Sequence, residues 1–172
     1  MDALRLTAGS RVADVGAGDG YFTWHLAKRV GPDGRVYAVD IQQRLIDDLT
    51  RESKKRDLPQ VHPTLGDVAD PHLPTGELDA VLVVNAYHEM DAHDAMLAKF
   101  AMSLKSGGRL AIIDKETKED RERGSYHSIH AIPKSIVRAE AEKAGFRFAG
   151  EQKGFQRARD KTDWWFLLFE KP

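Results

Sequence analysis

Three glycines lie within five positions of the segment VADVGAGDGYF, residues 12–22. Gly16, Gly18 and Gly20 carry no Cβ atom, so a ligand can approach the main chain closely there. A helical pattern follows at once, and the first turn of a helix offers unpaired N–H groups. The acidic Asp14, in the preceding apolar run, would repel a phosphate and attract an ammonium group. The spacing therefore predicts a ligand that carries a positive charge.

Two common phosphate-binding motifs do not fit this glycine loop. A dinucleotide fingerprint, G-x-G-x-x-G, would need its third glycine at position 21, which is Tyr21. A P-loop would need Gly-Lys-Ser/Thr after the glycines, and the sequence does not have it. A nicotinamide-dependent oxidoreductase is therefore disfavoured.

Two further carboxylates follow the next predicted strands. Asp40 ends the second strand, where folds of this kind hydrogen-bond a ribose diol. Asp67 follows the third strand and can accept a hydrogen bond from the amine of a purine. Ile41 and Val68 offer apolar surfaces to the faces of that base. The predicted ligand thus combines a ribose, a purine and an amino group.

The elements that must position these residues alternate along the chain. Apolar runs of strand length are separated by segments with helical spacing, and Gly, Pro and Asp bound them. Strands are predicted at residues 11–15, 35–40, 61–65, 78–85 and 109–114, followed by a terminal pair at 146–155 and 163–172. The pattern predicts an α/β fold of one domain over residues 1–172. Its sheet is doubly wound, seven-stranded and mostly parallel, with helices on both faces and an antiparallel C-terminal hairpin strand.

Local signals around the fourth and fifth strands give three further expectations. Asp91 is expected to cap a helix, and residues 106–108, Ser-Gly-Gly, are expected to end it. From Lys115 to Ser128 the sequence is polar and shows no periodicity. We therefore expect a mobile loop there, close to the site.

Composition excludes several classes of function. Among 172 residues there is no cysteine, which removes thiolate metal sites and thiol nucleophiles. A net charge of −1 does not give the broad positive field of a nucleic-acid binder. No apolar run approaches the ~20 residues of a membrane span, and the first ten residues lack an export signal. We expect a cytoplasmic protein without a membrane partner.

Five segments, in order, resemble the class I S-adenosylmethionine-dependent methyltransferase family over nearly the whole chain. They are VADVGAGDGYF, VYAVDI, GDVAD, LDAVLVVNAYHEM and LKSGGRLAIID. The resemblance implies S-adenosyl-L-methionine as the cofactor and methyl donor. Asp19 and Ser106 depart from the residues that the family often has. Only ten residues precede the first strand, whereas many relatives carry helices there that cover the donor. We therefore expect no N-terminal lid.

The resemblance also implies which residues hold the donor. Gly16 and Gly18 would contact its methionine part, and Asp14 would orient the ammonium group. Asp40 would hold the ribose hydroxyls. The implied contacts to adenine and to the methionine amine are made by Ile41, Asp67, Val68 and the backbone carbonyl of Asn85.

The acceptor side is predicted from the segment after the fourth strand. His88 is the candidate general base, and Tyr87 would position the acceptor or form an apolar wall. For both, a structural role is an open alternative. Tyr126, His127 and His130 belong to a segment that could close over the acceptor, and with Tyr87 and His88 they form the predicted substrate-binding set.

No metal is expected from the spacing of possible ligands. His88, Glu89 and His93 give H-E-x-x-x-H, one residue longer than the helical zinc pair. Catechol-type methyltransferases hold magnesium with carboxylates and an Asn, and Asn85 and Asp114 offer only part of that set. The lack of cysteine also counts against arsenite methylation and cytosine C5 methylation.

The sequence favours methyl transfer from S-adenosylmethionine to an unidentified small-molecule acceptor by in-line displacement. A methyltransferase acting on RNA or protein is the second hypothesis, because residues 115–123 and 153–161 carry positive charge. A non-catalytic S-adenosylmethionine-binding module is the third. A nucleic-acid partner is not expected, and the oligomeric state, a homodimer included, is left open.

Overall fold

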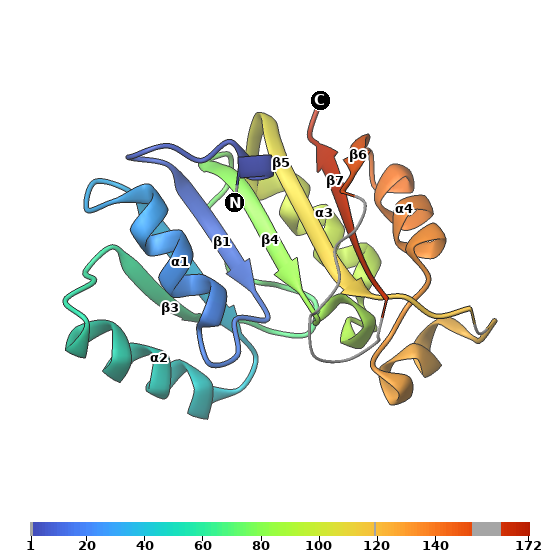
Figure 1. Ribbon diagram of the computed structural model, residues 1–172, viewed down its shortest axis with the longest axis horizontal. Coiled ribbons are helices and arrows are strands. Elements are labelled where there is room, and N and C mark those ends of the chain that lie inside the picture. The colour runs from blue at the N-terminus through green and yellow to red at the C-terminus, as the bar shows by residue number, and fades with distance from the viewer. Residues whose placement is uncertain (1, 119, 153–162) are drawn as a thin grey trace.

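The computed structural model describes residues 2–118, 120–152 and 163–172 (Figure 1). Seven strands within these residues form one sheet, in the order β3-β2-β1-β4-β5-β7-β6. They are β1 Arg11–Val15, β2 Arg35–Asp40, β3 Val61–Leu65, β4 Leu78–Val84, β5 Leu104–Lys115, β6 Arg147–Glu151 and β7 Trp164–Glu170. Strands β1 to β5 pair in parallel, whereas β7 runs antiparallel to both β5 and β6. The predicted fold class is confirmed.

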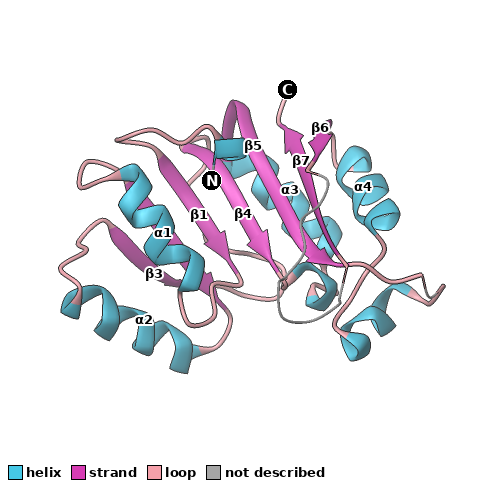
Figure 2. Cartoon of the chain, in the orientation of Figure 1, coloured by secondary structure: helices cyan, strands magenta, loops and turns pink. Residues whose placement is uncertain are grey.

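Helices cover both faces of this sheet (Figure 2). They are α1 Tyr21–Val30, α2 Gln43–Lys55, α3 His93–Ser103 and α4 Lys134–Lys143, with short 3-10 segments η1 Asp2–Leu4, η2 Tyr87–Glu89 and η3 Arg123–Ile129. In β1, Val12 packs in one apolar cluster with Leu26 of α1, and the next residue, Ala13, packs in the other with Phe100 of α3. Neighbouring residues of a strand thus pack into apolar clusters on opposite faces of the sheet, which explains why the central strands are apolar throughout.

Three local predictions differ from the structure. Helix α3 begins at His93 with Ala92 as its N-cap, so Asp91 does not occupy the capping position. The helix ends at Ser103 and not at residues 106–108, because the buried Leu104 already pairs with Leu78 of β4 as the first residue of β5. Part of the predicted loop 115–128 is ordered as η3, since the side chain of Tyr126 is fully buried there.

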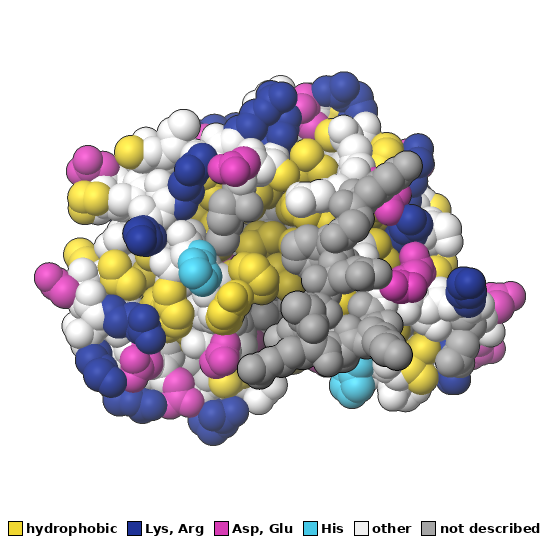
Figure 3. Space-filling model, in the orientation of Figure 1, with side chains coloured by type: hydrophobic (Ala, Val, Ile, Leu, Met, Phe, Trp, Pro, Cys, Tyr) yellow, Lys and Arg dark blue, Asp and Glu magenta, His cyan; other side chains and the backbone are white. Residues whose placement is uncertain are grey.

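Within the described ranges, no helix combines the length and the apolar composition needed to cross a bilayer. Figure 3 shows cationic and acidic side chains interspersed around one face of the molecule, with hydrophobic side chains gathered toward its middle.

Candidate active site

A cavity of about 360 Å³ opens beyond the carboxyl ends of β1, β2 and β4. The strand order reverses between β1 and β4, and the loops that follow them diverge at this point, as at the ligand sites of doubly wound folds. The volume lies in the range of small-molecule sites. Of the predicted donor-binding residues, all but Asp14 line it: Gly16, Gly18, Asp40, Ile41, Asp67, Val68 and Asn85.

The glycine loop after β1 forms one wall of the cavity. Gly16 and Gly18 have φ angles of +74° and +56°, in the left-handed region that glycine adopts without strain. A Cβ atom on Gly16 would lie 2.5 Å from the Cβ of Ala86, so this glycine lets the segments after β1 and β4 pack together. A Cβ atom on Gly18 would meet nothing within 4 Å, so the space beside this residue is open.

Asp40, at the end of β2, is held between two loops. Asp40 is only 8% exposed, and its Oδ2 atom accepts a hydrogen bond from the N–H of Gly18 at 3.0 Å. Its Oδ1 atom accepts from the N–H of Gln42, also at 3.0 Å. Each carboxylate oxygen can accept a further bond, so the group can still receive two vicinal hydroxyls.

Two large apolar residues are exposed in the cavity. Ile41 is 58% exposed and Val68 is 68% exposed, and they follow β2 and β3 respectively. Exposed apolar side chains that line a cavity are typical of a binding site for a flat or apolar group. Asp67, beside Val68, already has a partner, because its carboxylate lies 3.2 Å from Nε2 of His72.

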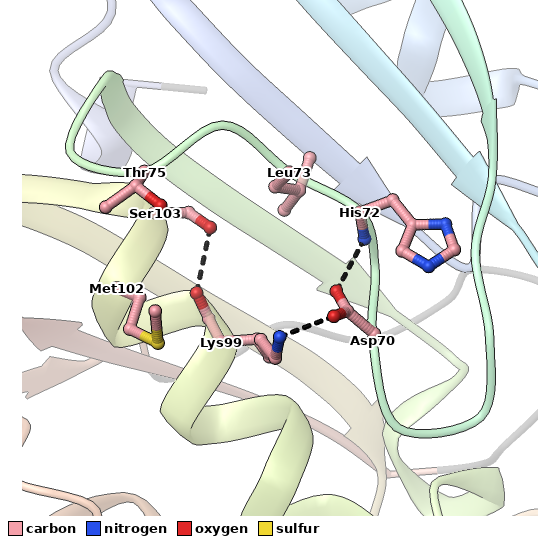
Figure 4. A pocket seen from close by; sticks show the side chains of 7 residues that line it. All are labelled: Asp70, His72, Leu73, Thr75, Lys99, Met102 and Ser103. Carbon is pink, nitrogen blue, oxygen red and sulfur yellow. Dashed lines mark hydrogen bonds and ion pairs between the residues drawn. The ribbon is translucent and has the colours of Figure 1, made fainter.

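An ion pair fixes the turn that carries Asp67 and Val68. The carboxylate of Asp70 accepts hydrogen bonds from the backbone N–H of His72 at 2.9 Å and from the ammonium group of Lys99 on α3 at 2.5 Å. Figure 4 shows both donors directed at Asp70 beside a second, smaller cavity. The hydrogen bond from Lys99 is the main cause that lowers the pKa of Asp70. This pair could not be found from the sequence, because residues on separate elements give no spacing signal.

Asp14 lies behind the cavity wall. Its side chain is buried, on the face of the sheet that α1 covers, and the hydroxyl of Thr23 on that helix donates a hydrogen bond to it at 2.6 Å. Burial raises the pKa of Asp14 to about 6 and outweighs the opposite effect of that hydrogen bond. Its role toward the donor's ammonium group stays a prediction.

A histidine–aspartate pair lies between the ends of β4 and β5. His88, in η2, is fully buried, and its Nδ1 atom lies 2.9 Å from each carboxylate oxygen of Asp114. An ionised Asp114 can only accept a hydrogen bond, so next to it a neutral His88 carries its hydrogen on Nδ1 and keeps a lone pair on Nε2. In the described part of the chain, Nε2 of His88 has no hydrogen-bond partner. The neighbouring Glu89 lines the cavity.

The chain matches a known protein family over the elements that form this cavity. A family model described as "Methyltransferase domain" matches residues 12–108, more than half of the chain. The chain belongs to the methyltransferase domain family. The class I S-adenosylmethionine-dependent methyltransferase family predicted from the motifs is thereby confirmed, and S-adenosyl-L-methionine is the methyl donor of this family.

Relatives of this methyltransferase domain include enzymes named for small molecules. It is 32% identical to nocamycin O-methyltransferase of Saccharothrix syringae, over 65% of this chain and 40% of that protein. It is also 32% identical to aklanonic acid methyltransferase of Streptomyces sp. (strain C5), over 64% of this chain and 50% of that protein. The chain therefore spans half or less of the length of these two relatives.

A solved structure agrees over most of the domain. The SAM dependent methyltransferase from Aquifex aeolicus matches with a TM-score of 0.82 and 26% identity, over 97% of this chain and 85% of that one.

The residues predicted to bind the acceptor have different surroundings in the methyltransferase fold. Tyr87 is fully buried, and its hydroxyl donates to Glu140 of α4 at 2.8 Å. Burial, reinforced by that carboxylate, raises the pKa of Tyr87. The buried Tyr126 accepts a hydrogen bond from the N–H of Arg121 at 3.1 Å and lines another cavity. The position of Tyr87 favours the structural alternative left open for it, and neither tyrosine lines the donor cavity.

The histidines of the predicted acceptor set lie together. The ring of His130 lies 5.5 Å from the ring of His88, centroid to centroid, and 6.3 Å from that of His127. His130 and His127 are both exposed, at or beside the end of η3. Two neighbours were not in the predicted set, namely Glu89 and Asp114. For Asp114, the signal available in the sequence was an acidic residue at the end of the predicted apolar strand 109–114.

Proposed function

We propose that this chain transfers the methyl group of S-adenosyl-L-methionine to a small-molecule acceptor by in-line displacement. A lone pair of the acceptor attacks the methyl carbon, the carbon–sulfur bond breaks, and its electron pair remains on sulfur in S-adenosylhomocysteine. The observation that carries the proposal is the cavity in which the open backbone at Gly18, the carboxylate of Asp40 and the apolar surface of Ile41 meet.

The residues that line this cavity support a placement for each group of the donor. The ribose hydroxyls would donate to Asp40, and adenine would lie between Ile41 and Val68. The methionine part would extend along Gly16 and Gly18 toward the backbone carbonyl of Asn85. In this arrangement the methyl group points toward η2 and His88.

A small acceptor is supported by two observations. The relatives above are named for nocamycin and aklanonic acid. Cationic side chains on the face in Figure 3 are interspersed with acidic ones, whereas RNA binding relies on a continuous basic surface. The basic segment 153–161, which favoured RNA in the sequence, lies outside the described residues.

His88 is the proposed general base for an acceptor that begins with a proton on its nucleophilic atom. Asp114 fixes the ring and keeps the hydrogen on Nδ1, so Nε2 can accept a proton. The proton would move to Nε2 as the methyl group is transferred, and Asp114 would stabilise the resulting imidazolium ion.

Calorimetry with S-adenosylmethionine, S-adenosylhomocysteine and NAD tests the donor. We expect the two sulfur nucleosides to bind and Asp40→Ala to weaken them by about 10- to 100-fold, because a hydrogen bond to a charged group is lost. Asp47→Ala removes an exposed carboxylate of α2 and is expected to leave binding unchanged. Tight binding of NAD alone would overturn the proposal.

The acceptor class is tested with donor that carries an isotope in its methyl group. The enzyme is incubated with a cell extract that has been separated into small molecules and macromolecules. Label in the small-molecule fraction is the expected result. Label in RNA or protein would instead support a methyltransferase that acts on macromolecules. Donor binding without any methyl transfer would support a non-catalytic module.

A further inference from the structure

Three side chains that can ligate a metal converge beside the donor cavity. His88, Glu89 and His130 each place one ligand atom so that all three atoms lie within 4.8 Å of one another. Oε1 of Glu89 is 3.5 Å from Nε2 of His88 and 3.6 Å from Nδ1 of His130. A tetrahedral ion with bonds of about 2.1 Å separates its ligands by roughly 3.4 Å. Two of the three separations already match that geometry.

His88 is prepared as a ligand by the residue behind it. Its Nδ1–H donates to the buried carboxylate of Asp114, which is the arrangement that orients metal-binding histidines in known sites. This leaves the lone pair of Nε2 on the side of Glu89. That nitrogen is buried and has no hydrogen-bond partner in the described ranges, an unfavourable state that a bound cation would relieve.

We propose that His88, Glu89 and His130 bind one divalent transition-metal ion, of the class of zinc or iron(II). Two imidazole nitrogens and one carboxylate suit such ions, whereas magnesium and calcium prefer oxygen ligands throughout. Three protein ligands leave at least one coordination position open, as in catalytic metal sites.

The spacing argument against a metal considered His88 together with His93, the next histidine along the chain. His93, which completes H-E-x-x-x-H, lies on α3 with its Nε2 atom 3.2 Å from Glu140. The fold instead brings His130, at the end of η3, beside His88. Spacing along the chain could not reveal this third ligand, because it comes from a separate element.

This inference deepens the proposed function and depends on it for the role of the metal. Glu89 also lines the donor cavity, so an ion held by it would lie at the edge of that cavity. A hydroxyl acceptor that binds there would lose its proton to water, since a metal lowers the pKa of a bound oxygen acid. The oxygen lone pair would then form the bond to the methyl carbon, and the carbon–sulfur electron pair would remain on sulfur. In a metal-bound form of the protein, the ion would activate the acceptor in place of His88, whose Nε2 atom would then be a ligand and not a base.

Cobalt(II) is the probe for this site, because its visible absorption reports coordination by nitrogen and oxygen without any enzymatic assay. The purified chain is stripped with a chelator and titrated with cobalt(II). We expect saturation at one equivalent and at least a 10-fold weaker affinity in His130→Ala and in Glu89→Gln. The side chains of both residues are about half exposed or more, so neither change is expected to unfold the chain. His25→Ala, which removes an exposed histidine of α1, is the matched control.

Three results would overturn the metal site: no saturable spectrum, an unchanged affinity in His130→Ala, or an equal loss in His25→Ala. Calorimetry with S-adenosylhomocysteine on the same samples separates the two proposals. If the nucleoside binds and cobalt does not, only the metal inference fails. If cobalt binds as expected and the nucleoside does not, the metal site stands and the proposed function fails.

Discussion

The carboxylate of Asp40 accepts a hydrogen bond from the backbone N–H of Gly18, with 3.0 Å between nitrogen and oxygen. This bond joins the end of β2 to the loop after β1, so the proposed ribose and methionine subsites are fixed relative to each other. The open space beside Gly18 is therefore held in place by a residue that itself faces the ligand.

Gly18→Ala should weaken donor binding more than it destabilises the fold. The left-handed φ of +56° makes a side chain there cost about 1–2 kcal/mol, but no atom within 4 Å clashes with the new Cβ. The methyl group would instead occupy space proposed for the donor. We expect a 10-fold or greater loss of affinity for S-adenosylhomocysteine, measured by calorimetry, in a protein that still unfolds cooperatively.

Gly9→Ala is the matched control, because Gly9 also has a left-handed φ, of +84°, and a Cβ atom added there would also meet nothing within 4 Å. Gly9 does not line the cavity. We expect Gly9→Ala to introduce the same backbone strain without any change in affinity for S-adenosylhomocysteine. Equal losses of affinity in both variants would show that strain alone explains the effect at Gly18.

Lys99→Met should weaken donor binding by about 3- to 5-fold with little change in stability. The ammonium group of Lys99 holds Asp70, and Asp70 fixes the turn that presents Val68 to the cavity. A partly exposed ion pair itself contributes at most about 1 kcal/mol to the free energy of unfolding. Calorimetry and urea denaturation of the same sample measure the two effects.

Lys105→Met controls for the loss of an exposed ion pair. Lys105 binds Asp79 at 2.5 Å, the same separation as in the Lys99–Asp70 pair, with similar exposure of both side chains. Neither residue lines the donor cavity. A loss of affinity in Lys105→Met as large as that in Lys99→Met would contradict a positioning role for Lys99.

The donor side of the site could be predicted from the sequence because parallel strands place their carboxyl ends at one edge. Gly18 and Val68 follow β1 and β3, and Asp40 is the last residue of β2, so identifying these three strands was enough to bring the residues together. The same reasoning identified the alternation of strands and helices. It required no knowledge of side-chain contacts.

The acceptor side could not be predicted in this way. Tyr87 follows β4 as the pattern required, but its side chain turns into the core toward Glu140. The partner of His88 is Asp114, and its ring neighbour is His130, on elements far apart in the chain. Contacts of this kind depend on packing between segments, and no local periodicity encodes them. The ion pair of Lys99 with Asp70 was missed for the same reason.

The stability of the chain should depend on pH through Asp14. Its folded-state pKa of about 6 lies above the ordinary value of 3.8, so the folded state binds the proton more tightly than the unfolded state does. The stability gained from this proton is fully present below about pH 3.8 and is lost as the pH rises through 6. Above that pH, the buried charge costs on the order of 3 kcal/mol.

Asp14→Asn removes this cost while its carbonyl can still accept the hydrogen bond of Thr23. The free energy of unfolding of the variant, relative to the original protein, should therefore rise between pH 4 and pH 7. Urea denaturation at several pH values measures it. Parallel pH profiles for the two proteins would show that Asp14 titrates at an ordinary pH in the folded state.

Asp114→Asn should change the tautomer of His88 without affecting the donor site. In the original protein the carboxylate of Asp114 requires the hydrogen on Nδ1, which leaves Nε2 as base or ligand. The amide of an asparagine can donate to Nδ1 instead and so favour the hydrogen on Nε2. Nitrogen-15 NMR of the imidazole distinguishes the two forms, and we expect the signal pattern to reverse in the variant.

Moving the hydrogen of His88 from Nδ1 to Nε2 should also affect function. A hydrogen on Nε2 blocks both the proposed proton transfer and the proposed metal bond, so cobalt affinity and methyl transfer should each fall by about 10- to 100-fold. Affinity for S-adenosylhomocysteine should stay within about 2-fold, because Asp114 does not line the donor cavity. An unchanged tautomer together with unchanged methyl transfer would mean that the Asp114–His88 pair supports only the packing of η2 against β5.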